Sequence, residues 1–182
     1  MKNIPALDPK VLDLVTEISK EPKVEAAMAF IKDQTEVAMQ EQIELCEIEA
    51  PTFHEEKRAA SVAERMKQYG LTDVHIDEIG NVIGIRKGTG SGPVLAIGAH
   101  MDSVFPAGTD VKVKKEGNIY RAPGIGDNCS GLRALLQVLR AMEKEDIRTV
   151  GDIWVVGTVG EEGNGDIRGS KHLCANNKLD GF

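Results

Sequence analysis

The chain has 182 residues, of which 41% are hydrophobic and 28% are charged, a composition typical of one globular domain and not of a disordered or fibrous protein. The net charge of -7 and the lack of basic blocks argue against a nucleic-acid partner. No run approaches the roughly 18 apolar residues of a membrane span, and the N-terminus lacks the apolar segment of a signal peptide, so we expect no membrane partner.

Cysteine usage favours a reducing compartment. Cys46, Cys129 and Cys174 are widely spaced and odd in number, which argues against a disulfide framework, and they contain no zinc-type pair. We therefore expect a cytoplasmic protein, in which Cys129 is a packing residue.

The first part of the chain is predicted to be helical. Apolar residues at helical spacing predict helices over 9–19, 24–45 and 59–69. The second is expected to be one long amphipathic helix, and the third ends at Gly70, in the position of a left-handed C-terminal cap. His54, in the turn before the third helix, is interpreted as solvated.

Short strands are predicted next. Residues 74–77 and 81–86 form two strands joined by a turn, and His75 is interpreted as a surface residue of the first. The glycine-rich loop 88–92 has no Lys-Ser/Thr ending and no helical pattern after it, so it is not a phosphate-binding loop.

The apolar run 94–97 predicts a buried strand of a parallel or mixed sheet, and the stretch GAHMDS follows it. His100 and Asp102 are therefore expected at the carboxyl end of that strand, where open α/β sheets bind ligands. His100 can bind a metal through one ring nitrogen while Asp102 accepts the proton of the other. The alternative is a structural hydrogen bond between the two residues.

A hairpin, with strands at 111–113 and 118–120, is predicted before the next helix. Asp127 then lies in a loop just before a strong helical pattern over 132–142, so its carboxylate is presented at a helix N-terminus. The alternative is that Asp127 or Ser130 simply caps this helix.

A second buried strand is predicted over 152–159, and it ends in Gly-Glu-Glu-Gly. The adjacent carboxylates of Glu161 and Glu162 repel each other unless a cation or separate roles accommodate both. The alternative is a solvated pair in a loop. A helix over 169–176 follows, and residues 179–182 resemble the start of another strand.

Together these elements predict an α/β fold with a mixed, largely parallel sheet flanked by helices on both faces, incomplete within this chain. One edge of that sheet would gather His100, Asp127 and Glu162, a nitrogen and two oxygen ligands suited to zinc, cobalt or manganese. A carboxylate can bridge two cations about 3.5–4 Å apart, as in two-metal hydrolases. Glu161, next to a ligand, is placed to act as general base on a metal-bound water.

Three motifs carry a resemblance to a known family: GAHMDSV at 98–104, GIGDNCSG at 124–131 and VGEEGNGDIRGSKHL at 159–173. They resemble the zinc-dependent exopeptidase family that includes carboxypeptidase G, aminoacylase, acetylornithine deacetylase, succinyl-diaminopimelate desuccinylase and peptidase T. A weaker resemblance runs from about residue 36 to the end.

The resemblance implies two divalent metal ions, expected to be zinc, with cobalt or manganese as alternatives. It implies that His100 binds one metal, Glu162 the other, and Asp127 bridges them. It also implies that Asp102 orients His100, that Glu161 is the catalytic base, and that the peptide bond after Asp127 is cis.

Relatives in this family supply further metal ligands and a dimerising lid domain from segments that would lie beyond Phe182. By this resemblance, residues 1–182 are the N-terminal portion of a metallopeptidase catalytic domain, without the lid and the C-terminal part of that domain. We expect this chain to be inactive alone, and the full-length protein to be a homodimer through its lid.

The expected activity is hydrolysis of peptide bonds in small peptides, most like a di- or tripeptide aminopeptidase of the peptidase T branch. The alternatives within the family are an N-acyl amino acid deacylase and a carboxypeptidase, because the same centre cleaves any amide. A non-catalytic metal-binding or regulatory module is the alternative of another class. The retained Glu161 argues against it, because a structural metal site has no use for a free base.

Overall fold

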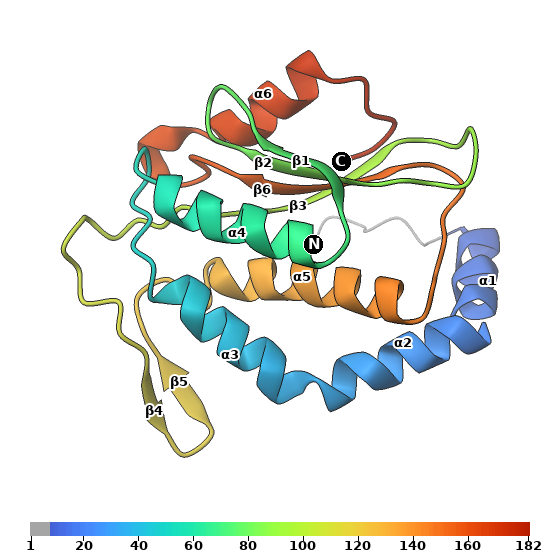
Figure 1. Ribbon diagram of the computed structural model, residues 1–182, viewed down its shortest axis with the longest axis horizontal. Helices are drawn as coiled ribbons and strands as arrows, with labels where there is room; N and C mark the ends of the chain where they lie inside the picture. The colour runs from blue at the N-terminus through green and yellow to red at the C-terminus, as the bar shows by residue number, and fades with distance from the viewer. Residues whose placement is uncertain (1–7) are drawn as a thin grey trace.

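The structure, a computed structural model, describes residues 8–182 and leaves the proline-containing N-terminal piece, residues 1–7, outside the described residues. The elements in chain order are α1 (Pro9–Ile18), α2 (Pro22–Asp33), α3 (Thr35–Cys46), α4 (Glu56–Gln68), β1 (Thr72–Ile76), β2 (Val82–Arg86), β3 (Leu95–His100), β4 (Lys114–Glu116), β5 (Ile119–Arg121), α5 (Cys129–Lys144), β6 (Ile153–Thr158), the 3₁₀ helix η1 (Gly163–Gly165) and α6 (Arg168–Asn176). Figure 1 shows their arrangement. No helix within 8–182 has the length and apolar character needed to cross a membrane.

The main sheet has the strand order β1-β2-β6-β3. The pair β3 and β6 is parallel, whereas β6 with β2 and β2 with β1 are antiparallel. Gly181 extends the parallel side, because its carbonyl accepts the N–H of Ala96 at 2.9 Å and it forms a parallel bridge with Leu95. The expected mixed sheet is confirmed, but the expectation that it is largely parallel is wrong for the described residues. Among its described strands only β3 pairs in parallel, with β6 and with the bridge at Gly181, because β1 and β2 join the sheet as an antiparallel hairpin.

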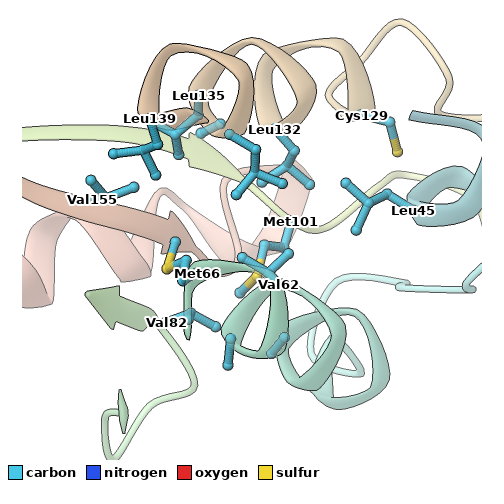
Figure 2. Packing of buried hydrophobic residues seen from close by; sticks show 14 of the residues in the cluster. Leu45, Val62, Met66, Val82, Met101, Cys129, Leu132, Leu135, Leu139 and Val155 are labelled. Atoms are coloured by element: carbon cyan, nitrogen blue, oxygen red, sulfur yellow. The ribbon is translucent and has the colours of Figure 1, made fainter. Parts of the chain in front are cut away.

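Helices cover both faces of this sheet, as predicted (Figure 1). On one face, α4 and α5 enclose the larger core, in which Leu132 and Leu136 of α5 and Val62 and Met66 of α4 are buried against the strands (Figure 2). On the other face, Leu173 of α6 packs with residues that include Val156 of β6. Strands buried on both faces need continuous apolar runs, which explains why β6 was evident in the sequence.

The predicted single helix over 24–45 is wrong, because the chain breaks at Gln34 into α2 and α3. The Thr35 hydroxyl donates to the carbonyl of Lys32 at 2.7 Å across the break. The bend lets both helices follow α5, whose Gln137 donates to the carbonyl of Ile31 at 2.8 Å (Figure 1). The apolar periodicity continues through one non-helical residue, so it could not reveal the break.

The hairpin is present but its first strand lies three residues later than predicted, at Lys114–Glu116. The Glu47 carboxylate accepts the backbone N–H of Val113 at 3.1 Å and binds the Lys112 ammonium at 2.7 Å. The predicted strand 111–113 is therefore held against the end of α3, and pairing begins only after it.

Arg58 of α4 ties the helices to the end of β3. Its side chain is 1% exposed, and it donates to the carbonyls of Met101 and Ile48 at 2.6 Å each. Buried carbonyls left without a donor cost roughly 1–3 kcal/mol each. Arg58 therefore stabilises the segment from which the next residue, Asp102, is presented.

We expect Arg58→Met to lower the free energy of unfolding by about 3 kcal/mol, because the buried carbonyl of Met101 and the half-buried carbonyl of Ile48 lose their donor while the volume is largely kept. Urea denaturation measures the change. Lys57→Met, one position earlier and exposed, is the matched control and should shift the midpoint little. Equal midpoints for the two variants would contradict the role given to Arg58.

Candidate metal centre

His100 is the last residue of β3, and each of its ring nitrogens faces an acidic residue. Nδ1 lies 3.2 Å from the backbone carbonyl of Asp102 and 3.5 Å from its carboxylate. Nε2 lies 3.0 Å from Oδ1 of Asp127 and 3.9 Å from Oε2 of Glu161. Asp102 can thus accept the Nδ1 proton, which directs Nε2 toward the acidic side chains.

The structure brings the three predicted ligands together, since one ligand atom each of His100, Asp127 and Glu162 lie within 4.8 Å of one another. They come from the ends of β3 and β6 and from the loop before α5, at the same end of the sheet in Figure 1. This meeting follows from the parallel pairing of β3 with β6, which places both carboxyl ends at one edge.

Asp102 is fully buried and is hydrogen-bonded on both carboxylate oxygens. It accepts the backbone N–H groups of Glu161 and Glu162 at 3.0 Å each and the Thr52 hydroxyl at 2.9 Å. Burial alone would raise its pKa, but these hydrogen bonds and the one with His100 hold the pKa of Asp102 well below its usual value. Asp102 therefore positions the glutamate loop as well as His100, a task that the sequence did not indicate.

Asp127 does not cap α5, and neither does Ser130. The side chain of Asn128 is the cap, accepting the backbone N–H of Gly131 at 3.1 Å, while the Ser130 hydroxyl donates to the carbonyl of Gly126. The carboxylate of Asp127 is free of helix capping and 77% exposed, and it faces His100. The peptide bond between Asp127 and Asn128 is cis, as expected.

An ion pair between Glu55 and Arg168 supports the loop that carries the two glutamates. Oε1 of Glu55 accepts the N–H of Gly160 at 3.0 Å, and Arg168 donates to both Glu55 oxygens at 2.9 and 3.0 Å. Gly160 has a φ of +58°, a conformation that favours glycine, and the Arg168 side chain fills the space where a Cβ would lie. Sequence reasoning missed Glu55, Arg168 and Thr52, because nothing local distinguishes them from other polar residues.

The electrostatics of the site reflect this crowding of carboxylates. Burial opposes protonation of His100, but Asp102, Glu161 and Asp127 outweigh it and raise the pKa of His100 to about 9. Burial and the charge of Asp127 raise the pKa of Glu162. Each shift reduces the net negative charge of the cluster.

A divalent cation fits this donor set. It would supply the positive charge that the cluster otherwise obtains from protons, and imidazole with carboxylates is a ligand combination used by zinc, cobalt and manganese. Deprotonation of His100 would accompany binding, because only the neutral imidazole is a ligand.

The other histidines of interest lie away from this centre. His54 and His75 are exposed, as expected. His172 of α6 contacts Glu78 at 3.0 Å and forms a second acidic group with Asp77 and Glu78. In that group Asp77 already accepts the backbone N–H groups that close the turn between β1 and β2, which is a structural role.

Comparison with known proteins connects the site to a family. Residues 96–182 match the family described as Peptidase family M20/M25/M40. A Pyrococcus abyssi protein, named provisionally as a LysW-lysine/LysW-ornithine hydrolase, is 34% identical over 120 residues, which are 66% of this chain and 32% of that protein. The chain thus spans about a third of the length of this curated relative.

Solved structures show the same fold. A tripeptidase from Staphylococcus aureus has a TM-score of 0.65 and 30% identity, over 79% of this chain and 41% of that one. The aminopeptidase PepT from Bacillus cereus also has a TM-score of 0.65, with 24% identity over 76% of this chain and 39% of that one, and at this identity it shows the fold alone.

Proposed function

We propose that this chain, whose residues 96–182 match peptidase family M20/M25/M40, carries the metal-binding half of a two-metal peptidase of small peptides. The observation that carries the proposal is the convergence of His100, Asp127 and Glu162 within 4.8 Å, beside Glu161. The resemblance to a tripeptidase at 30% identity supports small peptides as substrates.

His100 and Glu162 would each hold one cation, zinc first, with cobalt or manganese as alternatives, and Asp127 would bridge the two. Cations bound there would lower the pKa of a water molecule and polarise the scissile carbonyl. Asp102 keeps the imidazole of His100 oriented through Nδ1 and fixes the glutamate loop through two backbone N–H groups.

Glu161 would be the general base. Its side chain is 43% exposed and stands beside the three ligands without being one of them. It would take a proton from the attacking water and pass it to the leaving amine. Because its neighbour Glu162 is committed to a cation, the two adjacent carboxylates would have separate roles.

A second candidate follows from the curated relatives. The Pyrococcus abyssi protein is 34% identical and is named for LysW-lysine and LysW-ornithine. The same centre would then release an amino acid from an N-acyl amide, and deacylase or carboxypeptidase activity is the alternative to aminopeptidase activity. A non-catalytic metal-binding module is the alternative of another class.

A substrate screen separates these candidates. The full-length protein would be loaded with zinc, cobalt or manganese and assayed against di- and tripeptides, N-acyl amino acids and peptides with a blocked N-terminus. We expect cleavage of free-amine peptides, with the chelator-treated protein as the control. Preference for N-acyl or blocked substrates would favour the second candidate, and bound metal without any turnover would favour the non-catalytic module.

We also propose that residues 1–182 are the N-terminal portion of a longer catalytic domain, with additional ligands and a dimerising lid supplied by other segments. The chain covers only 32–41% of the length of the relatives quoted above, which supports this proposal.

The isolated 182 residues should therefore bind zinc weakly and hydrolyse no peptide at a useful rate, because metal affinity depends on the number of ligands and on a preorganised site. Calorimetric titration with zinc, paired with a peptide-cleavage assay, measures both. Tight binding of two zinc ions with robust turnover would contradict the proposal.

A further inference from the structure

A groove of about 320 Å³ adjoins the candidate metal centre, and Glu162 is one of its lining residues. We call it the Phe53 groove. One wall is the segment before α4, with Phe53, and the other is the loop after β3, with Val104 and Phe105. Its volume lies at the lower end of the roughly 300–1,000 Å³ that small-molecule sites occupy, which suits one or two residues of a peptide.

The walls expose large apolar side chains beside a charged centre. Phe53 is 51% exposed, and both Val104 and Phe105 are exposed as well. Scattered apolar side chains are ordinary on a protein surface. Here three exposed apolar side chains and the candidate ligand Glu162 line the same hollow.

The backbone of Phe53 has a strained conformation. Its φ is +75°, a left-handed conformation that a bulky residue adopts only when its surroundings impose it, and such residues gather at functional sites. The Arg168 guanidinium lies over its ring at 5.2 Å from the centroid, and Glu55 anchors that guanidinium. The ring is thus positioned by the same ion pair that supports the glutamate loop.

The two walls are also joined to each other and to the centre. The N–H of Ser103 donates to the carbonyl of Ala50 at 2.9 Å, and Pro51 and Ser103 form a parallel bridge. Thr52, next to Phe53, donates to the carboxylate of Asp102. These hydrogen bonds therefore fix the position of the groove relative to His100 and Glu162.

We propose that the Phe53 groove is the subsite for an apolar side chain, aromatic or branched, of the substrate residue next to the scissile bond. This inference rests on the proposed peptide hydrolysis. Glu162 is the charged residue on the lining, and the proposed function commits its carboxylate to a cation. An apolar side chain would cover Phe53 and Phe105, whereas an acidic side chain would be desolvated against them with no basic residue among the described lining residues to pair with.

The test uses the full-length, metal-loaded protein and two peptide series, Xaa-Gly-Gly and Gly-Gly-Xaa, with alanine, leucine, phenylalanine or aspartate as Xaa. In one series we expect kcat/KM for leucine and phenylalanine to exceed that for alanine by about tenfold or more, carried by KM, and aspartate to be the poorest. Phe53→Gly removes the ring and accepts the positive φ without strain, so it should fold at least as stably as the wild type. Phe53→Gly and Phe105→Ala should each reduce the preference to within about threefold.

Met28→Ala is the matched control, because Met28 is an apolar residue with 62% exposure on α2, a helix that lies far from the site in Figure 1. It should keep the wild-type preference. A wild type that cleaves these peptides with the same leucine-to-alanine ratio as Phe53→Gly would overturn the groove assignment and leave the proposed function standing. A metal-loaded wild type that cleaves neither series would overturn the proposed function and the subsite with it.

Discussion

Glu161→Gln in the full-length protein is expected to lower kcat by about 10²–10⁴-fold while the metal content stays nearly unchanged. The amide keeps the size of the side chain but cannot take a proton from water. The three groups that converge as ligands do not include Glu161, whose nearest approach to His100 Nε2 is 3.9 Å. Steady-state kinetics on a cleaved peptide, together with metal analysis of the purified variant, measure both halves of the prediction.

The neighbouring glutamate provides the matched control. Glu162→Gln should lose bound metal, because this carboxylate belongs to the converging set. Both substitutions make the same chemical change one position apart, so general damage to the loop would affect them alike. Activity of Glu161→Gln comparable to that of the wild type would refute its assignment as the base.

Asp127→Ala is expected to remove both cations together and to abolish turnover. A bridging carboxylate serves two sites, so its loss weakens each of them, whereas loss of a terminal ligand weakens one. The side chain is 77% exposed and Asn128 carries the helix cap, so the fold should be little affected. Metal content and thermal unfolding of the variant check these expectations.

Asp13→Ala, which removes an exposed aspartate of α1, is the control for the general effect of losing a negative charge. It should leave the metal content and activity unchanged. Retention of one tightly bound metal per chain in Asp127→Ala would contradict the bridging role and make Asp127 a terminal ligand.

The chain's local patterns were enough to predict the elements that carry the candidate ligands. Residues 94–97 and 152–159 are largely apolar runs, and the strands β3 and β6 form there. β6 is buried as predicted, whereas β3 is only partly buried, with Leu95 46% exposed. The position of a strand in the sheet fixes the position of a ligand at or just after the end of that strand. His100 and Glu162 could therefore be assigned to one sheet edge from the sequence, and the structure places them there.

Particular side-chain contacts, one local and others between distant segments, decided the rest. The cap by Asn128 left Asp127 free to face His100, although Asp127, Asn128 and Ser130 are all residue types that cap helices. Glu47 displaced the first hairpin strand, and α5 fixed the break at Gln34.

The sequence by itself thus determined which side chains lie at the ends of β3 and β6, because apolar periodicity and strand boundaries are local properties. Only the tertiary structure decided that Asp102 and the pair of Glu55 with Arg168 hold the glutamate loop, and that Phe53 stands beside it. These partners are separated by 59 or more positions in the chain. The chain contains many carboxylates and guanidinium groups of the same chemistry, and only the packing of the elements decides which of them come into contact.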